Sequence, residues 1–141
     1  MIVQNFRAKT DTRFALWPEP ETDDLVITAA LARLIFGSEV NIQIPPNLTS
    51  PGFGGLLRSG INDWGGISPV TRDFINPERM WPAIRVLRDV TEQAGFKLRE
   101  RLAVYPEFVR ERMDFIPEML RTRVAQLADE SGLVRPGEER W

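Results

Sequence analysis

Cysteine and histidine are both absent from the 141 residues of this chain. The chain therefore offers no thiolate or imidazole group. This excludes, within the chain, a zinc site of the usual type, a disulfide, a cysteine-bound iron–sulfur cluster and a Cys or His nucleophile. Chemistry carried out by these residues depends on carboxylates, hydroxyls, amides, Lys or Arg.

Long apolar runs and basic tracts are missing as well. No stretch approaches the roughly 20 residues that span a bilayer, and the N-terminus lacks the layout of a signal peptide. The formal net charge is −2 and Lys and Arg are dispersed, which argues against nucleic-acid binding. We expect a cytoplasmic protein with one core, bound to neither nucleic acid nor membrane.

Strand and helix patterns alternate along the chain. Short runs at residues 2–6, 40–44 and 61–66 are typical of strands. Helices are expected at about 22–36, around 56–57, at 77–94 and at 117–130. Strands that alternate with helices indicate a parallel sheet and an α/β fold.

The two longer helices of this pattern have recognisable ends. Helix 22–36 is expected to have Thr22 as its cap and Gly37 after its last turn. Its broad apolar stripe predicts burial against a sheet; the stripe comprises Ile27, Leu31, Leu34 and Ile35, widened by Val26, Ala29 and Ala30. Helix 77–94 is expected to start at Asn76 and Pro77, with Met80 on its inner face.

Polar residues follow each expected strand. In parallel sheets the ligand lies at the carboxyl ends of the strands, and amides, hydroxyls and a carboxylate suit a polar small molecule. The candidate binding residues are Asn5, Arg7, Asn41, Gln43, Asn47, Asn62, Asp63, Gly65, Gly66 and Ser68. No residue is assigned as catalytic and none as a metal ligand.

Structural alternatives remain open for several of these residues. Asn62 and Asp63 can cap the turn that follows them. Trp64 can pack in the core beside the glycines. Arg7 can pair with a nearby carboxylate as well as bind an anion.

Five stretches carry a resemblance to a known family: "IVQNFRAK", "NIQIPPNL", "GINDWGGISPVT", "FINPERMWP" and "ERLAVYPEFV". Together they resemble the later part of the radical S-adenosylmethionine domain of the FO synthases, which make 7,8-didemethyl-8-hydroxy-5-deazariboflavin. The run "DWGGISPVT", followed by "NPE" and "WP", is the most specific. The resemblance implies that residues 1–105 form the C-terminal portion of a (β/α) TIM-type barrel and 106–141 a helical tail or interdomain linker.

The resemblance also implies an activity and its cofactors. Such enzymes are lyases that bind a 4Fe-4S cluster through a CxxxCxxC loop, and the cluster binds S-adenosylmethionine. The adenosyl radical oxidises an adduct of tyrosine and 5-amino-6-ribitylaminouracil, which then cyclises with loss of ammonia. Asn41, Gln43, Asn62 and Asp63 match strand-end motifs of the family, and from their placement at strand ends we assign them to the substrate or the adenosyl group.

The absence of cysteine departs from the family pattern, because this chain cannot bind the cluster. We interpret it as a fragment that begins at Met1 and is inactive alone. Its expected partners are an N-terminal, cluster-bearing half of the barrel and a domain or protein that forms the tyrosine adduct. The loop "KTDT", residues 9–12, also departs from the family.

Two other interpretations remain open. The chain could belong to a sister radical enzyme, such as the tyrosine-adduct-forming synthase. It could also be a non-catalytic binding or assembly module that keeps the polar strand ends and has no redox centre.

Overall fold

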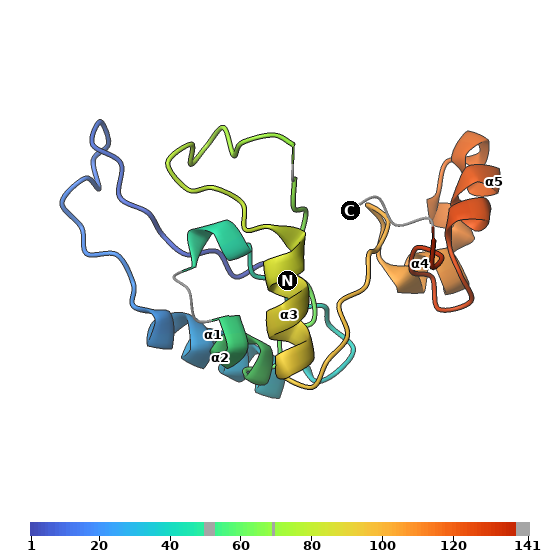
Figure 1. Cartoon of the computed structure of the whole chain (residues 1–141), viewed down its shortest axis with the longest axis horizontal. Helices are drawn as coiled ribbons and strands as arrows, with labels where there is room; N and C mark the ends of the chain where they lie inside the picture. Colours follow the sequence, from blue (N-terminus) through green and yellow to red (C-terminus); the bar gives the residue numbers. More distant parts are fainter. Residues whose placement is uncertain (50–52, 69, 138–141) are drawn as a thin grey trace. The chain divides into compact units, whose positions relative to one another are not determined.

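A computed structural model describes residues 1–49, 53–68 and 70–137 of the chain. The chain divides into two compact units, residues 1–96 and 97–141. The first contains α1 (Thr22–Phe36), a 3-10 turn η1 (Pro46–Leu48), α2 (Phe53–Arg58) and α3 (Ile84–Gln93) (Figure 1). Helix α2 packs against both α1 and α3.

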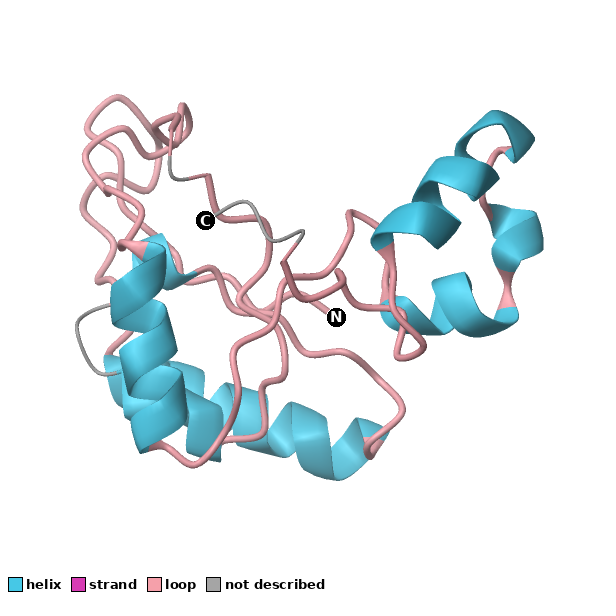
Figure 2. Cartoon of the chain, turned by 45° about the vertical axis from the view of Figure 1, so that its right-hand side comes forward, coloured by secondary structure: helices cyan, strands magenta, loops and turns pink. Residues whose placement is uncertain are grey.

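Three extended segments lie side by side in the first unit. Isolated parallel bridges join Ile2 to Gln43 and Gln43 to Asp63. Two backbone hydrogen bonds join the first pair of segments. The Val3 N–H donates to the Gln43 carbonyl, and the Gln43 N–H donates to the Met1 carbonyl, both at 2.9 Å. Among the described residues the pairing goes no further than such bridges, so the ribbon between helices is drawn as loop (Figure 2). The predicted barrel stays a prediction.

The middle segment lines the core of the first unit. Ile42 and Ile44 are fully buried, and so are Leu48, Leu56 and Leu87 from η1, α2 and α3. Asn41 and Gln43 alternate with the two isoleucines and are only partly buried. This alternation places apolar side chains on one face of the segment and amides on the other, as the sequence pattern predicts.

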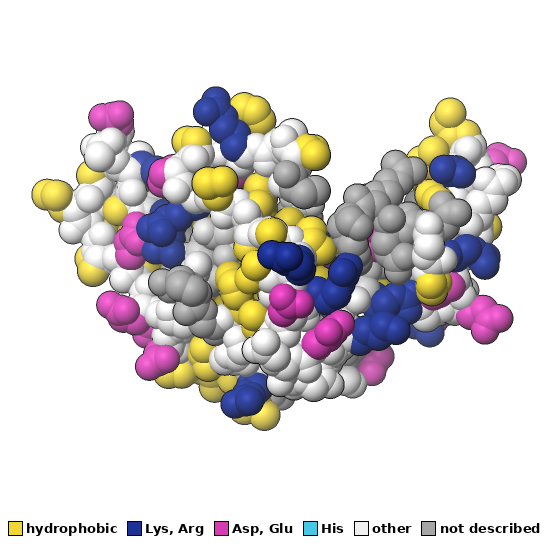
Figure 3. All heavy atoms as spheres, in the orientation of Figure 1, with side chains coloured by type: hydrophobic (Ala, Val, Ile, Leu, Met, Phe, Trp, Pro, Cys, Tyr) yellow, Lys and Arg dark blue, Asp and Glu magenta, His cyan; other side chains and the backbone are white. Residues whose placement is uncertain are grey.

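Helix α1 has the predicted bounds, and Ala29 of its predicted stripe is buried, but the four large residues of that stripe are exposed. The buried residues are Leu25, Ala29 and Ala32, whereas Leu34 is 81% exposed and Ile35 74%. Small alanines let the helix approach the core closely, which leaves the larger stripe outside. Hydrophobic atoms are visible along the lower edge of this unit, where α1 lies (Figure 3). The N-cap residue also differs from the prediction: it is Glu21 and not Thr22. The backbone N–H of Glu21 donates to the Asp24 carboxylate.

Helix α3 starts later than predicted. Asn76 and Pro77 belong to a turn, in which the Arg79 N–H bonds the Asn76 carbonyl, and the helix begins only at Ile84. Pro82 interrupts the stretch, and Met80 is exposed instead of buried. The helix ends as predicted, with the Gly95 N–H on the Glu92 carbonyl.

The second unit contains α4 (Pro106–Glu111), a 3-10 turn η2 (Met113–Phe115) and α5 (Glu118–Leu127). Val109, Ile116 and Ala128 form its small core. Antiparallel bridges join Arg101 to Leu133 and Ala128 to Val134. Because Ala128 forms the second bridge, it is extended and not helical. Helix α5 therefore ends at Leu127, before the predicted residue 130. The predicted domain boundary at 105/106 falls within this unit and stays a prediction.

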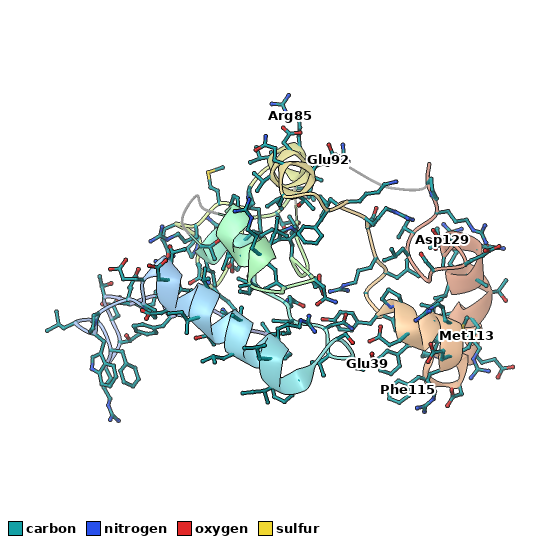
Figure 4. The ribbon with its side chains drawn as sticks, turned by 90° about the horizontal axis from the view of Figure 1, so that it is seen from below. Glu39, Arg85, Glu92, Met113, Phe115 and Asp129 are labelled. Carbon is teal, nitrogen blue, oxygen red and sulfur yellow. The ribbon has the colours of Figure 1, made fainter. Side chains whose placement is uncertain are left out.

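One ion pair fastens the end of the second unit. The Arg99 guanidinium bonds the Asp129 carboxylate at 2.8 Å and the Val134 carbonyl at 2.8 Å. Hydrogen bonds from Ser131, together with Arg99, hold the pKa of Asp129, labelled in Figure 4, well below its ordinary value. In the described parts of both units, no helix is long and apolar enough to cross a membrane.

Candidate functional site

Polar side chains from separate segments meet beyond the carboxyl ends of the first two extended segments. Asn5 donates through Nδ2 to the Leu48 carbonyl oxygen at 3.3 Å, and Arg7 donates to the same oxygen. Asn47, the neighbour of Leu48, donates to Asp73. We call Asn5, Arg7, Asn47 and Asp73 the strand-end cluster. The structure thus brings three of the ten candidate residues together, and their role in binding stays a prediction.

Asp73 is the centre of the loop that follows the "DWGGISPVT" run, and sequence reasoning missed it. Its Oδ1 accepts the backbone N–H groups of Ile75 and Asn76 at 2.9 and 3.1 Å. Its Oδ2 accepts Nδ2 of Asn47 at 2.9 Å and Nδ2 of Asn76 at 3.1 Å. The signal for this role was the spacing "DFIN", in which an aspartate side chain can bond backbone two and three residues on.

The hydrogen bonds of Asp73 favour its ionised form. Burial alone would raise the pKa of Asp73, but the bonds from Asn76, Ile75 and Asn47 outweigh burial and hold the pKa below its ordinary value. A carboxylate that accepts four N–H groups is strongly stabilised as the anion. Asp73 is thus an acceptor only, which fixes the direction of each amide that faces it.

Arg7 forms the ion pair that the alternative interpretation favoured. Its guanidinium lies 2.5 Å from Glu19, and Glu19 also accepts the Ala8 N–H at 3.1 Å. The hydrogen bond from Arg7 is the main cause that lowers the pKa of Glu19 below its ordinary value of 4.5. This ion pair holds the loop that follows the first segment. A second ion pair holds the loop "KTDT": Nζ of Lys9 lies 2.5 Å from Oε1 of Glu78.

This pairing predicts a pH effect on stability. Because the pKa of Glu19 is lower in the folded chain, the unfolded chain binds more protons as the pH falls below 4.5. The contribution of Glu19 is complete above that pH and is lost as the pH drops further. We expect Glu19→Gln to reduce the free energy of unfolding at pH 7 by about 0.5–1 kcal/mol and to flatten its acid dependence.

Urea denaturation between pH 7 and pH 3 measures this effect. Glu92→Gln is the matched control, because the Glu92 side chain lies exposed on α3 (Figure 4). An identical acid dependence for Glu19→Gln and the unmodified chain would contradict the prediction.

A second group of candidate residues surrounds Gly65. The Gly65 N–H bonds Oδ1 of Asp63 at 2.7 Å, so Asp63 caps the turn, as one alternative proposed. Gly65 has φ +83°, and a Cβ there would lie 2.4 Å from Nε2 of Gln43. Only glycine fits this position, since any side chain would be strained and would displace Gln43.

Asn41 and Asn62 form a third group, at the amino ends of two extended segments. Asn62 donates to Oδ1 of Asn41 at 2.7 Å, and its own Oδ1 accepts the Ile42 N–H at 2.8 Å. Arg33, at the end of α1, donates to Oδ1 of Asn62 and to the Gly60 and Val40 carbonyls. These bonds give both asparagines a structural role. Their assignment to a ligand stays a prediction, and it competes with that role.

The remaining candidates lie in the loop after Gly65. Oγ of Ser68 accepts the Thr71 N–H at 3.2 Å and bonds Oγ1 of Thr71 at 2.6 Å. Gly66 is exposed, and a Cβ there would meet nothing within 4 Å.

Trp64 is buried, with Nε1 3.4 Å from Oγ1 of Thr91 and its ring centroid 5.7 Å from that of Phe53. The core alternative for Trp64 is therefore confirmed.

Three atoms of the strand-end cluster are buried and have no hydrogen-bond partner: Oδ1 of Asn5, Oδ1 of Asn47 and Nε of Arg7. Leaving one such atom unpaired costs about 1–3 kcal/mol. Unpaired groups on such neighbouring residues indicate a partner, either an ordered water or a bound polar molecule.

The residues of the chain fit the two implied cofactors differently. They do not fit an iron–sulfur cluster, since the chain has no cysteine and the described residues contain no group of carboxylates that could hold a metal ion. The strand-end cluster does fit a polar organic ligand, such as S-adenosylmethionine or a ribityl substrate, because it presents unpaired acceptors and a donor.

The chain is similar to several curated proteins. It is 51% identical over 129 residues to the FO synthase of Streptomyces avermitilis and 51% identical over 136 residues to that of Streptomyces coelicolor. It is 46% identical over 135 residues to the 7,8-didemethyl-8-hydroxy-5-deazariboflavin synthase of Methanopyrus kandleri. These matches cover 92%, 96% and 96% of this chain.

The chain spans a small part of these relatives: 15% and 16% of the two Streptomyces proteins and 40% of the Methanopyrus protein. No protein-family model and no solved structure matches it. The resemblance that the five sequence stretches predicted is confirmed by these relatives. The chain is homologous, over nearly its whole length, to one segment of the FO synthases.

Proposed function

We propose that this chain supplies the later part of the barrel of a radical S-adenosylmethionine FO synthase, a lyase that forms the deazaflavin chromophore. The identity of 46–51% to named synthases carries the proposal. The parallel order of segments at Ile2, Gln43 and Asp63 supports it, since successive strands of a (β/α) barrel are parallel neighbours.

In this proposal the chain binds and orients the substrate, and the electron-transfer chemistry lies elsewhere. The cluster with its S-adenosylmethionine supplies the oxidation from a cluster-bearing, N-terminal portion of the barrel. The strand-end cluster and the residues around Gly65 bind polar groups of the tyrosine/5-amino-6-ribitylaminouracil adduct. Hydrogen bonds from these residues hold the adduct in one orientation. Another domain or protein forms the adduct from tyrosine.

The exposed stripe on α1 supports the proposal of a further barrel portion. Ile27, Leu31, Leu34 and Ile35 are each more than half exposed, which is more than isolated surface leucines require. A preceding strand and helix of the barrel would cover this stripe and pair with the segment at Ile2.

Complementation tests the proposed function. The chain is mixed under anaerobic conditions with the cluster-bearing portion of an FO synthase, reductant, S-adenosylmethionine and the adduct. We expect deazaflavin fluorescence that neither portion gives alone. Absence of fluorescence, although the two portions associate on a sizing column, would argue against the proposal and in favour of a non-catalytic binding module.

A further inference from the structure

Two amide groups of the strand-end cluster have a direction that their partners fix. Nδ2 of Asn47 faces the Asp73 carboxylate, and Nδ2 of Asn5 faces the Leu48 carbonyl oxygen. Both partners only accept hydrogen bonds, so neither amide can turn its oxygen toward them. The oxygens of Asn5 and Asn47 are therefore the atoms left for another partner, and both are buried and unpaired.

We infer that Asp73 is a positioning residue, which turns the amide oxygen of Asn47 into a hydrogen-bond acceptor for an N–H or O–H group of the bound small molecule. Asn5 presents a second acceptor of the same kind. This inference rests on the proposed function, and it names the chemistry of that site: the ligand donates to the two amide oxygens.

The charge of Asp73 is what makes the direction of Asn47 unique. With a neutral amide at position 73, one atom could still accept the Ile75 and Asn76 N–H groups. The other would be an NH2 group facing the NH2 groups of Asn47 and Asn76. Asn47 would then flip to accept from it, and its NH2 group would replace the acceptor oxygen. Asp73→Asn thus reverses the polarity of the site without changing its size.

Calorimetric titration of the full chain with 5-amino-6-ribitylaminouracil, which carries amine, ring N–H and hydroxyl donors, tests the inference. We expect Asp73→Asn to weaken binding at least about ten-fold, because a donor of the ligand then meets a donor of the protein. The double variant Asp73→Asn with Asn47→Asp keeps the total charge and restores an acceptor. It should return the affinity to within about three-fold of the unmodified chain.

Asn76→Ala is the matched control. It removes one hydrogen bond from Asp73 in the same loop, yet it leaves the bond between Asp73 and Asn47 in place. Its affinity should stay within about three-fold of the unmodified chain. If Asp73→Asn does not fold, the double variant decides alone, since failure to bind with the acceptor restored overturns the inference.

The side-chain amide signals of Asn47 in a nitrogen–proton NMR spectrum give a readout that needs no ligand. They should show protection from exchange in the unmodified chain and lose it in Asp73→Asn, and both signals should shift on titration as neighbouring side chains move to admit the ligand. Equal affinity of Asp73→Asn and the unmodified chain would overturn the inference and leave the proposed function standing. No binding of either the ribitylaminouracil or S-adenosylmethionine to the unmodified chain would overturn both.

Discussion

Leu25→Ala is expected to reduce the free energy of unfolding of the first unit by at least about 2 kcal/mol. Leu25 is 5% exposed and lies on the face of α1 that contacts the core. Truncation removes buried methyl groups and leaves a cavity that the surrounding side chains fill only partly. Urea denaturation followed by circular dichroism measures the loss.

Leu34→Ala is the control on the same helix, since Leu34 is 81% exposed. Both substitutions change helix propensity by the same amount, so the difference between them isolates burial. Leu34→Ala should change stability by no more than about 0.5 kcal/mol. A larger loss for Leu34→Ala than for Leu25→Ala would mean that the predicted stripe is buried after all.

Trp64→Ala should cost about 3–5 kcal/mol, the largest effect we expect of a single substitution. The indole is 6% exposed, packs edge-on against Phe53 of α2 and donates toward Thr91 of α3. It thereby links two helices to the third extended segment. Thermal unfolding of the variant should therefore begin far below that of the unmodified chain, or the first unit should not fold.

Trp17→Ala is the matched control, because Trp17 also packs edge-on against a phenylalanine but is 62% exposed. The ring centroids of Trp17 and Phe14 are 4.9 Å apart. It should cost less than about 1 kcal/mol. Trp64→Phe should fall between the two, since it keeps an aromatic ring but loses the donor to Thr91. Equal costs at the two tryptophans would refute the assignment of Trp64 to the core.

The bounds of α1 could be predicted from the sequence, but its orientation could not. Asp23 and Asp24 at the start and Gly37 at the end are local signals. The buried face depends on what the helix contacts, and apolar residues on most sides of α1 give no single answer. The burial of Ala29 and Ala32 reflects close approach to the rest of the unit, which no local pattern encodes.

The strand-end cluster was predictable in part. The placement of Asn5, Arg7 and Asn47 followed from the rule that loops meet at the carboxyl ends of parallel segments. Asp73 was missed because "NPE" was interpreted as a helix start, a strong local signal. Long-range bonds of Asp73 to Asn47 compete with that signal and hold the stretch in a turn. Asn41 was also assigned to the carboxyl end, although it stands near the start of the 40–44 segment and lies at the amino end beside Asn62, which Arg33 contacts.

The guanidinium of Arg33 joins three stretches of the first unit by hydrogen bonds. It donates to the carbonyls of Gly37, Val40 and Gly60 and to the amide of Asn62, groups from the helix end and from two later stretches of backbone. These acceptors come together only when all three stretches are in place, and a lysine ammonium lacks the planar fork to reach them. The last turn of α1 and the amino ends of both stretches should accordingly open and close as a single folding unit.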